Sequence, residues 1–264
     1  MSRTNQRTWQ KQIIGHFLLT VHLDSPSEAG SDKHPKLAEF VRHMLHLADE
    51  TRLPVTWAVS DPAYSAATPL VLRSAGAHEL AILGDANWVG PTAGRTRFAR
   101  ELARRASQAR AAGINLKTLV PRVESVHPHI DLVIKQQISA VAGIAPPRAN
   151  RGQAIPRALH YGVWEIPVSA AMPLPPRWFS GKRFLFRQIR SAAQSGAVFQ
   201  LVVDAPAMDQ EARRGLAAFE WLLRRVAELR NRGMVCVETL ADAAARLSAV
   251  PISTPQHSIL RKAA

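Results

Sequence analysis

Acidic and histidine side chains follow three apolar segments of the sequence, where they could bind a metal ion or transfer protons. His22 and Asp24 end the first of these segments, Asp85 follows another, and Asp204 follows a third. The carboxyl ends of parallel strands meet at one rim, where α/β proteins build their sites. Because residues two apart in a strand share a face, His22 and Asp24 should point the same way. We therefore predict Asp24 and Asp204 as catalytic residues and, if a divalent metal such as Zn²⁺ binds, Asp24, His22 and Asp85 as its ligands.

The elements that must position these residues alternate along the chain. Short apolar segments and helix-length amphipathic segments follow one another about seven times, which is typical of a parallel α/β sheet or barrel. We expect strands at about 13–23, 55–59, 78–83, 116–120, 139–143, 161–168, 197–203 and 234–237, and helices at about 35–52, 64–74, 95–112, 127–137, 182–194, 208–232 and 240–247.

This alternation predicts one irregular (β/α)7-type barrel over residues 13–248, with no linker that would divide it. Residues 1–12 are polar and basic, and we expect a flexible arm there. Residues 249–264 show no periodicity, and we expect a flexible C-terminal tail.

The composition is strongly basic and restricts the classes of partner. Lysine and arginine total 34 against 20 acidic residues, a formal charge of +14. Such an excess favours polyanions, and arginines concentrate in the predicted helix 95–112, although a solvated helix face explains them equally well. No helix-turn-helix, zinc-finger, P-loop or nucleophile-elbow motif accompanies them.

The one cysteine, Cys236, rules out a disulfide framework, and its apolar neighbours predict a buried position. No apolar run reaches the roughly 20 residues of a membrane span, and no signal-peptide cleavage site follows the first apolar run. We expect a soluble, cytoplasmic protein.

The first apolar run resembles the first motif of the polysaccharide deacetylase (NodB-homology) family. In that family the run ends in two adjacent aspartates followed by Gly-Pro. Asp24 matches the second aspartate and Pro26 the proline, whereas Leu23 stands at the position of the first aspartate. One acidic residue of the motif is therefore replaced.

The pair His78-Glu79 resembles the opening of the family's next motif. The two metal-binding histidines of that motif would fall on Leu83 and Asn87, and Trp88 fits its aromatic surroundings. Both expected histidines are therefore replaced as well.

Later segments resemble the family more weakly, and the likeness extends over roughly 13–247. The segment 118–122, which ends in Arg122, stands where the family has an Arg-Pro-Pro-aromatic strand end. Trp164 matches the tryptophan of a later strand, and Val203 or Asp204 replaces the histidine of the last motif.

The resemblance implies the family's fold and argues against its chemistry. In the family a metal held by Asp and two His activates water, a second Asp removes its proton, and a His protonates the leaving amine. Of the metal ligands only Asp24 remains, whereas a catalytic zinc needs three, and Leu23 cannot act as a base.

We therefore expect a polysaccharide deacetylase-like protein with no cofactor and without the standard activity, which binds a carbohydrate or protein partner. Two alternatives stay open: a divergent hydrolase that cleaves C–N bonds of N-acetylated sugars with rearranged metal ligands, zinc or another divalent metal, and a basic nucleic-acid-binding module. The candidate binding residues are His22, Asp85, Asn87, Trp88, Arg122 and Trp164.

Overall fold

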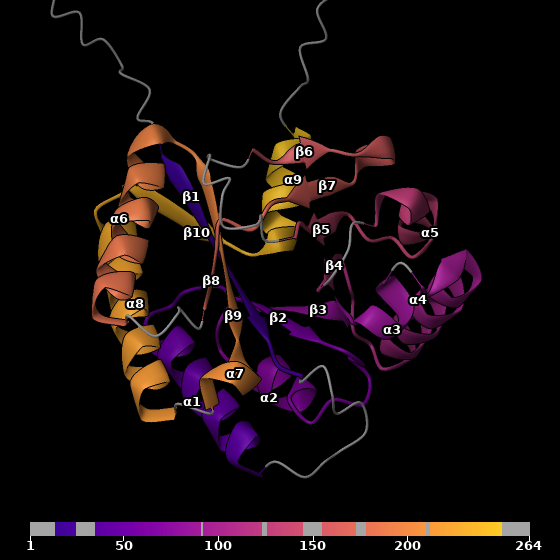
Figure 1. Ribbon diagram of the computed structural model, residues 1–264, viewed down its shortest axis with the longest axis horizontal. Coiled ribbons are helices and arrows are strands. Elements are labelled where there is room, and N and C mark those ends of the chain that lie inside the picture. The colour runs from indigo at the N-terminus through magenta and orange to yellow at the C-terminus, as the bar shows by residue number, and fades with distance from the viewer. Residues whose placement is uncertain are drawn as a thin grey trace, which may run out of the picture.

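A mixed, mostly parallel sheet curls into a half-barrel with helices around it (Figure 1). The computed structural model describes residues 14–24, 35–90, 92–122, 126–144, 155–172, 178–209 and 212–249. The strands are β1 (Gly15–His22), β2 (Thr56–Val59), β3 (Glu79–Gly84), β4 (Thr118–Pro121), β5 (Ala140–Ala142), β6 (Arg157–Ala158), β7 (Trp164–Ile166), β8 (Ala170–Met172), β9 (Val198–Asp204) and β10 (Val235–Glu238).

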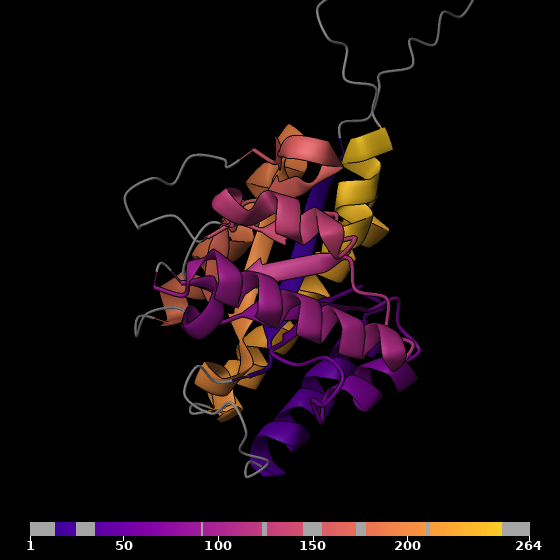
Figure 2. The same cartoon turned by 90° about the vertical axis from the view of Figure 1, so that its right-hand side faces the viewer.

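Helices connect most of the strands and cover the outer side of the half-barrel. Figure 2 shows α4 lying across the side of the half-barrel that faces the viewer. The helices are α1 (Pro35–Glu50), α2 (Thr68–Arg73), α3 (Ala86–Val89), α4 (Gly94–Ala111), η1 (His127–His129), α5 (Ile130–Lys135), η2 (His160–Gly162), α6 (Trp178–Ser195), α7 (Ala205–Asp209), α8 (Ala212–Asn231) and α9 (Leu240–Ala249).

The strand order confirms the predicted fold class. The strands run β6-β7-β5-β4-β3-β2-β1-β9-β8, and every neighbouring pair is parallel except β6 and β7. Strand β1 lies between β2 and β9 in this order and pairs with β9 along one edge, from His16 to His22. Its other edge is divided, because Gly15–Leu18 pair with β10 and Thr20–His22 pair with β2.

Alternation along β1 separates an outer layer from the interior of the half-barrel. Phe17, Leu19 and Val21 belong to the large core beneath the outer helices. Leu18 points the other way, into a second core of mostly small side chains. Helix α9 packs against β5 and β7 and contributes to this inner core, whose buried members are Leu18, Ala58, Ala81, Leu83, Val120, Ala140, Ala142, Ile166, Leu240, Ala243 and Ala244.

The His-Glu pair at the start of β3 holds the amino-terminal end of the half-barrel together. Glu79 accepts hydrogen bonds from the hydroxyl of Thr56 (2.9 Å), from the hydroxyl of Thr118 and from the backbone N–H of Ala241 in α9 (3.1 Å). Burial raises the pKa of Glu79, although these hydrogen bonds oppose the rise. His78 lies 3.1 Å from the carboxylate of Asp49, so the pair serves packing at the end of the strands opposite the predicted site.

Three local predictions need correction. The residues predicted as one helix over 208–232 form two helices, α7 and α8, and α7 begins directly after β9. No strand was predicted between residues 168 and 197, yet Ala170–Met172 pair with β9 and form β8. Cys236 is exposed rather than buried; it lies on β10, which pairs with only the first half of β1 and ends the sheet there.

The predicted arm and tail lie outside the described residues, except that Ala249 ends α9. Within the described residues no helix is both long enough and apolar enough to span a membrane.

Candidate functional site

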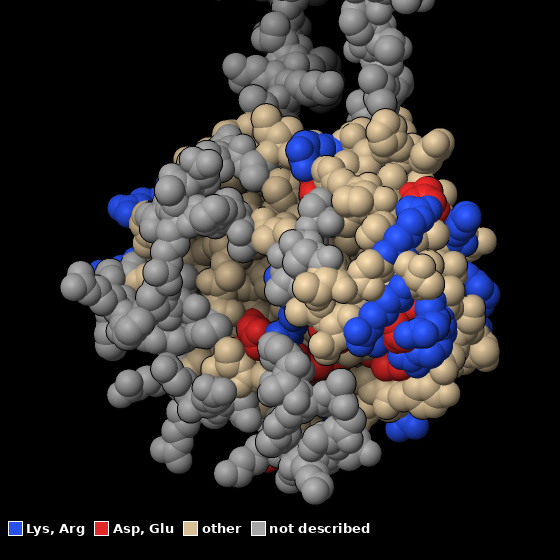
Figure 3. Space-filling model, turned by 45° about the vertical axis from the view of Figure 1, so that its right-hand side comes forward, with Lys and Arg blue, Asp and Glu red and all other residues tan. Residues whose placement is uncertain are grey.

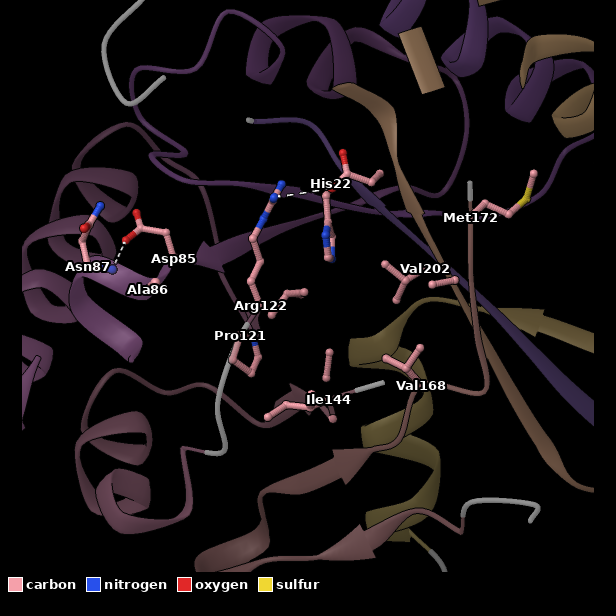
Figure 4. Close-up of a pocket in the computed structure, with 15 residues that line it drawn as sticks. His22, Asp85, Ala86, Asn87, Pro121, Arg122, Ile144, Val168, Met172 and Val202 are labelled. Atoms are coloured by element: carbon pink, nitrogen blue, oxygen red, sulfur yellow. Dashed lines mark hydrogen bonds and ion pairs between the residues drawn. The ribbon is translucent and has the colours of Figure 1, made fainter. Parts of the chain in front are cut away.

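A cavity of about 440 Å³ opens at the carboxyl ends of the strands, and we call it the mouth cavity. Figure 4 shows the ring of His22 and the side chain of Arg122 turned toward the same space, with Asp85 and Asn87 to one side. Its volume lies within the range typical of small-molecule sites. The lining residues are His22, Asp85, Ala86, Asn87, Val120, Pro121, Arg122, Ala142, Gly143, Ile144, Val168, Ala171, Met172, Val202 and Asp204.

His22 ends β1 and is the buried polar group of the mouth cavity. The residue is 8% exposed, and its Nε2 has no hydrogen-bond partner within the described chain. Burial, and after it the charge of Arg122, lower the pKa of His22 to about 3. The imidazole is therefore neutral at physiological pH and offers one unused polar atom to a ligand.

Arg122 connects the two predicted catalytic aspartates. Its backbone N–H donates to the carbonyl of Gly84 (2.9 Å), which fixes the residue just past β4. Its Nη2 donates to the backbone carbonyl of Asp24, and its Nη1 lies 3.5 Å from Oδ2 of Asp204. An arginine remains charged at any relevant pH, so this mouth carries a fixed positive charge.

Both aspartates already accept hydrogen bonds from the backbone. The carboxylate of Asp24 accepts from the N–H of Ser60, and Oδ1 of Asp204 accepts from the N–H of Ala207 in the first turn of α7 (3.1 Å). Burial raises the pKa of Asp24 above its ordinary value, although Ser60 and Arg122 oppose the rise. Asp204 lines the cavity, whereas Asp24 is not among the lining residues.

Asp85 and Asn87 lie at the rim of the mouth cavity on the short helix α3. Oδ1 of Asp85 accepts from the backbone N–H of Asn87 (2.8 Å), so this carboxylate caps α3. Both residues remain accessible to a ligand at the edge of the cavity.

The two tryptophans predicted to bind do not line the mouth cavity. Trp88 is 2% exposed and packs against Phe98, with the guanidinium of Arg105 4.7 Å from its ring centre. Trp164 lies on β7 and donates from Nε1 to the hydroxyl of Ser248 (2.9 Å). The structure thus brings together His22, Asp85, Asn87, Arg122 and Asp204 and leaves these rings elsewhere.

The aliphatic wall of the cavity was not predicted from the sequence. It is formed by Ile144, Val168, Met172 and Val202, together with Val120. Val202 could have been found, because it lies two residues before Asp204 on one strand and therefore shares its face. Met172 could not, because β8 was not predicted.

The residues of the mouth do not fit the divalent-metal site predicted above, with Asp24, His22 and Asp85 as ligands. The donor atoms of Asp24, His22 and Asp85 do not all lie within 4.8 Å of one another, so these side chains are too far apart to share an ion. Among the residues described, three side chains that do lie this close are His16, Cys236 and Glu238. A catalytic zinc needs three protein ligands. The guanidinium of Arg122, which contacts both Asp24 and Asp204, further disfavours a cation there.

The arginine-rich helix α4 carries many of its charges in ion pairs. Arg95 pairs with Asp131, and Arg104 lies 2.9 Å from Asp61 and 3.5 Å from Glu101. Figure 3 shows basic and acidic side chains interleaved on this side of the molecule. Since exposed pairs of this kind neutralise much of the positive field, the described surface favours a solvated helix face over a polyanion site.

The fold resembles those of carbohydrate-active proteins at very low sequence identity. A probable polysaccharide deacetylase from Pseudomonas aeruginosa has a TM-score of 0.58 and 13% identity, with 87% of this chain and 89% of that chain covered. A putative polysaccharide deacetylase involved in O-antigen biosynthesis from Bordetella bronchiseptica has a TM-score of 0.54 and 11% identity, with 81% and 90% covered.

A 4-alpha-glucanotransferase from Thermococcus litoralis has a TM-score of 0.57 and 11% identity, with 88% of this chain but 40% of that chain covered. No family model and no curated protein matches the sequence. One fold therefore accompanies at least two named activities, so the function must be argued from the site.

Proposed function

We propose that this protein, which shares the half-barrel fold of polysaccharide deacetylases, binds an N-acylated sugar in the mouth cavity and does not hydrolyse it by the metal-dependent route. The observation that carries the proposal is the position of Arg122, which contacts both aspartates beside a neutral His22 whose Nε2 has no partner among the residues that the structure describes. A cation would be repelled there, whereas a neutral polar group would be bound.

A secondary amide matches the hydrogen-bonding groups of the mouth cavity. It carries one N–H donor and one carbonyl acceptor. The carbonyl can accept from the guanidinium of Arg122, and a neutral imidazole can pair through Nε2 in either tautomer. A buried polar atom without a partner costs about 1–3 kcal/mol, so a ligand that satisfies His22 recovers that free energy.

The aliphatic wall supports the same ligand class. Val168, Met172 and Val202 would contact the methyl group of an acetyl substituent, while Asp85 and Asn87 at the rim could accept from or donate to sugar hydroxyls. The small volume of the cavity favours a sugar over a protein segment as the partner.

Replacing Arg122 by glutamine should weaken binding of an N-acetylglucosamine oligomer about tenfold, because a charged hydrogen-bond donor to the amide oxygen is lost. Isothermal titration calorimetry at fixed salt would measure the effect. Arg104→Gln is the matched control, because Arg104 lies on the outer surface in an exposed ion pair. The variant should bind the oligomer with the same affinity as the unmodified protein.

The same titration with a glucosamine oligomer tests the role of the acyl group, and its affinity should be much lower. Equal affinity for both oligomers, or no binding of either, would contradict the proposal. If the protein released acetate from the oligomer in the presence of zinc, and the Asp24→Ala variant did not, the result would instead favour the divergent hydrolase. Steeply salt-dependent binding to generic DNA would favour the nucleic-acid-binding module.

A further inference from the structure

A second cluster of polar side chains lies at the opposite end of β1, far along the strand from the mouth cavity. It consists of His16 on β1 with Cys236 and Glu238 on β10. His16 is the register partner of Cys236, and Glu238 lies two residues further along the same strand. Residues that are register partners, or two apart on one strand, share a face of the sheet, so the three side chains point to one side.

The donor atoms of this cluster are already gathered. One donor atom from each residue lies within 4.8 Å of the other two. Nδ1 of His16 is 2.9 Å from Oε1 of Glu238, and within the described residues it makes no well-aligned hydrogen bond. The imidazole nitrogen and the carboxylate oxygen are therefore close enough to bind the same ion.

The carboxylate of the cluster is held in place from its other side. Arg246 of α9 donates to Glu238 from Nε (3.1 Å to both oxygens) and from Nη2 (2.7 Å to Oε1). A carboxylate has about four acceptor positions, so this pairing orients Glu238 and leaves room for a further contact. Metal-ligating carboxylates are commonly fixed by such outer hydrogen bonds.

We propose that His16, Cys236 and Glu238 form a binding site for one transition-metal ion of the zinc type. Thiolate, imidazole and carboxylate are the ligands that zinc uses in proteins, and a thiolate disfavours magnesium and calcium. Cys236 is exposed, which gives an ion access from solvent and leaves a coordination position for water. The proposal does not depend on the ligand of the mouth cavity.

Such an ion would join β1 to β10 at the divided edge of β1. These strands are paired over only four register positions, Gly15 to Leu18. An ion that binds the folded chain and not the unfolded chain raises the stability by mass action. The melting temperature should therefore rise on addition of zinc.

Cobalt(II) titration of the full chain, freed of metal with a chelator, tests the site directly. We expect one Co²⁺ per chain with a thiolate-to-cobalt charge-transfer band, and displacement of the band by Zn²⁺. Cys236→Ser should abolish the band, and His16→Gln should weaken binding at least tenfold, in line with the loss of one ligand. Both substitutions are conservative, and circular dichroism would verify that each variant folds.

Asp24→Asn is the matched control, because Asp24 lies at the other end of β1. The band should be unchanged in that variant. Three results would overturn the proposal: no charge-transfer band in the unmodified protein, a band that persists in Cys236→Ser, or a band that disappears in Asp24→Asn. Tight zinc binding by a protein that shows no thiolate-to-cobalt band would place the ion at another site and would also overturn the proposal.

Discussion

Replacing Glu79 by alanine is expected to destabilise the fold by about 3–4 kcal/mol, the largest effect that we predict for a single residue. The substitution removes the shared acceptor of Thr56, Thr118 and the backbone N–H of Ala241. The last of these lies in the first turn of α9, where a carboxylate also stabilises the helix. Urea unfolding followed by circular dichroism would measure the loss.

Glu50→Ala provides the matched control for this prediction. Glu50 is an exposed glutamate at the end of α1, 3.3 Å from His46, and loss of such a pair should cost less than about 0.5 kcal/mol. Glu79→Gln should lie between the two, because the amide keeps one acceptor. A cost below about 1 kcal/mol for Glu79→Ala would show that the network is dispensable.

Acidification from pH 7 to pH 5 should cost the unmodified protein roughly 2 kcal/mol more than it costs a His22→Gln variant. His22 has a pKa of about 3 in the folded protein, against 6.5 for an ordinary histidine. Below pH 6.5 the unfolded chain therefore takes up a proton that the folded chain does not. This contribution to stability is complete at neutral pH and declines as the pH falls toward 3.

The comparison with the variant isolates this one histidine. Asp24 and Glu79 have raised pKa values, and their effect runs in the opposite direction, since each favours the folded state at low pH. Both residues are present in both proteins, so their contributions largely cancel in the difference. As the pH falls from 7 to 5, the urea midpoint of the unmodified protein should decrease more steeply than that of His22→Gln. Parallel curves for the two proteins would mean that His22 is accessible to protons in the folded state.

The class of the fold was predictable because its signals are local. The run from Phe17 to Leu23 alternates between the outer core and the interior in the way that a buried strand requires. His22, Asp85 and Asp204 could be assigned to one rim from the ends of their predicted strands alone. The low-identity structural relatives agree with the resemblance found in the motifs.

The finer features of the site depend on tertiary contacts that no local pattern encodes. The sequence predicts Asp24 and Asp204 as catalytic acids, but their carboxylates accept hydrogen bonds from the backbone N–H groups of Ser60 and Ala207. Trp88 reads as a binding residue beside Asn87, but a single turn of α3 directs its ring into the core. Strand β8 has three residues and depends on its pairing with β9.

The divided edge of β1 has a consequence for synthesis on the ribosome. β1 emerges before the other described strands, whereas β9 and β10, which pair with one whole edge and half of the other, begin more than 180 residues after the start of β1. Until the last quarter of the chain has been made, β1 can pair only with β2, over Thr20–His22. Unpaired strand edges favour association with other chains, so the nascent protein should depend on chaperones until β9 and β10 have been made.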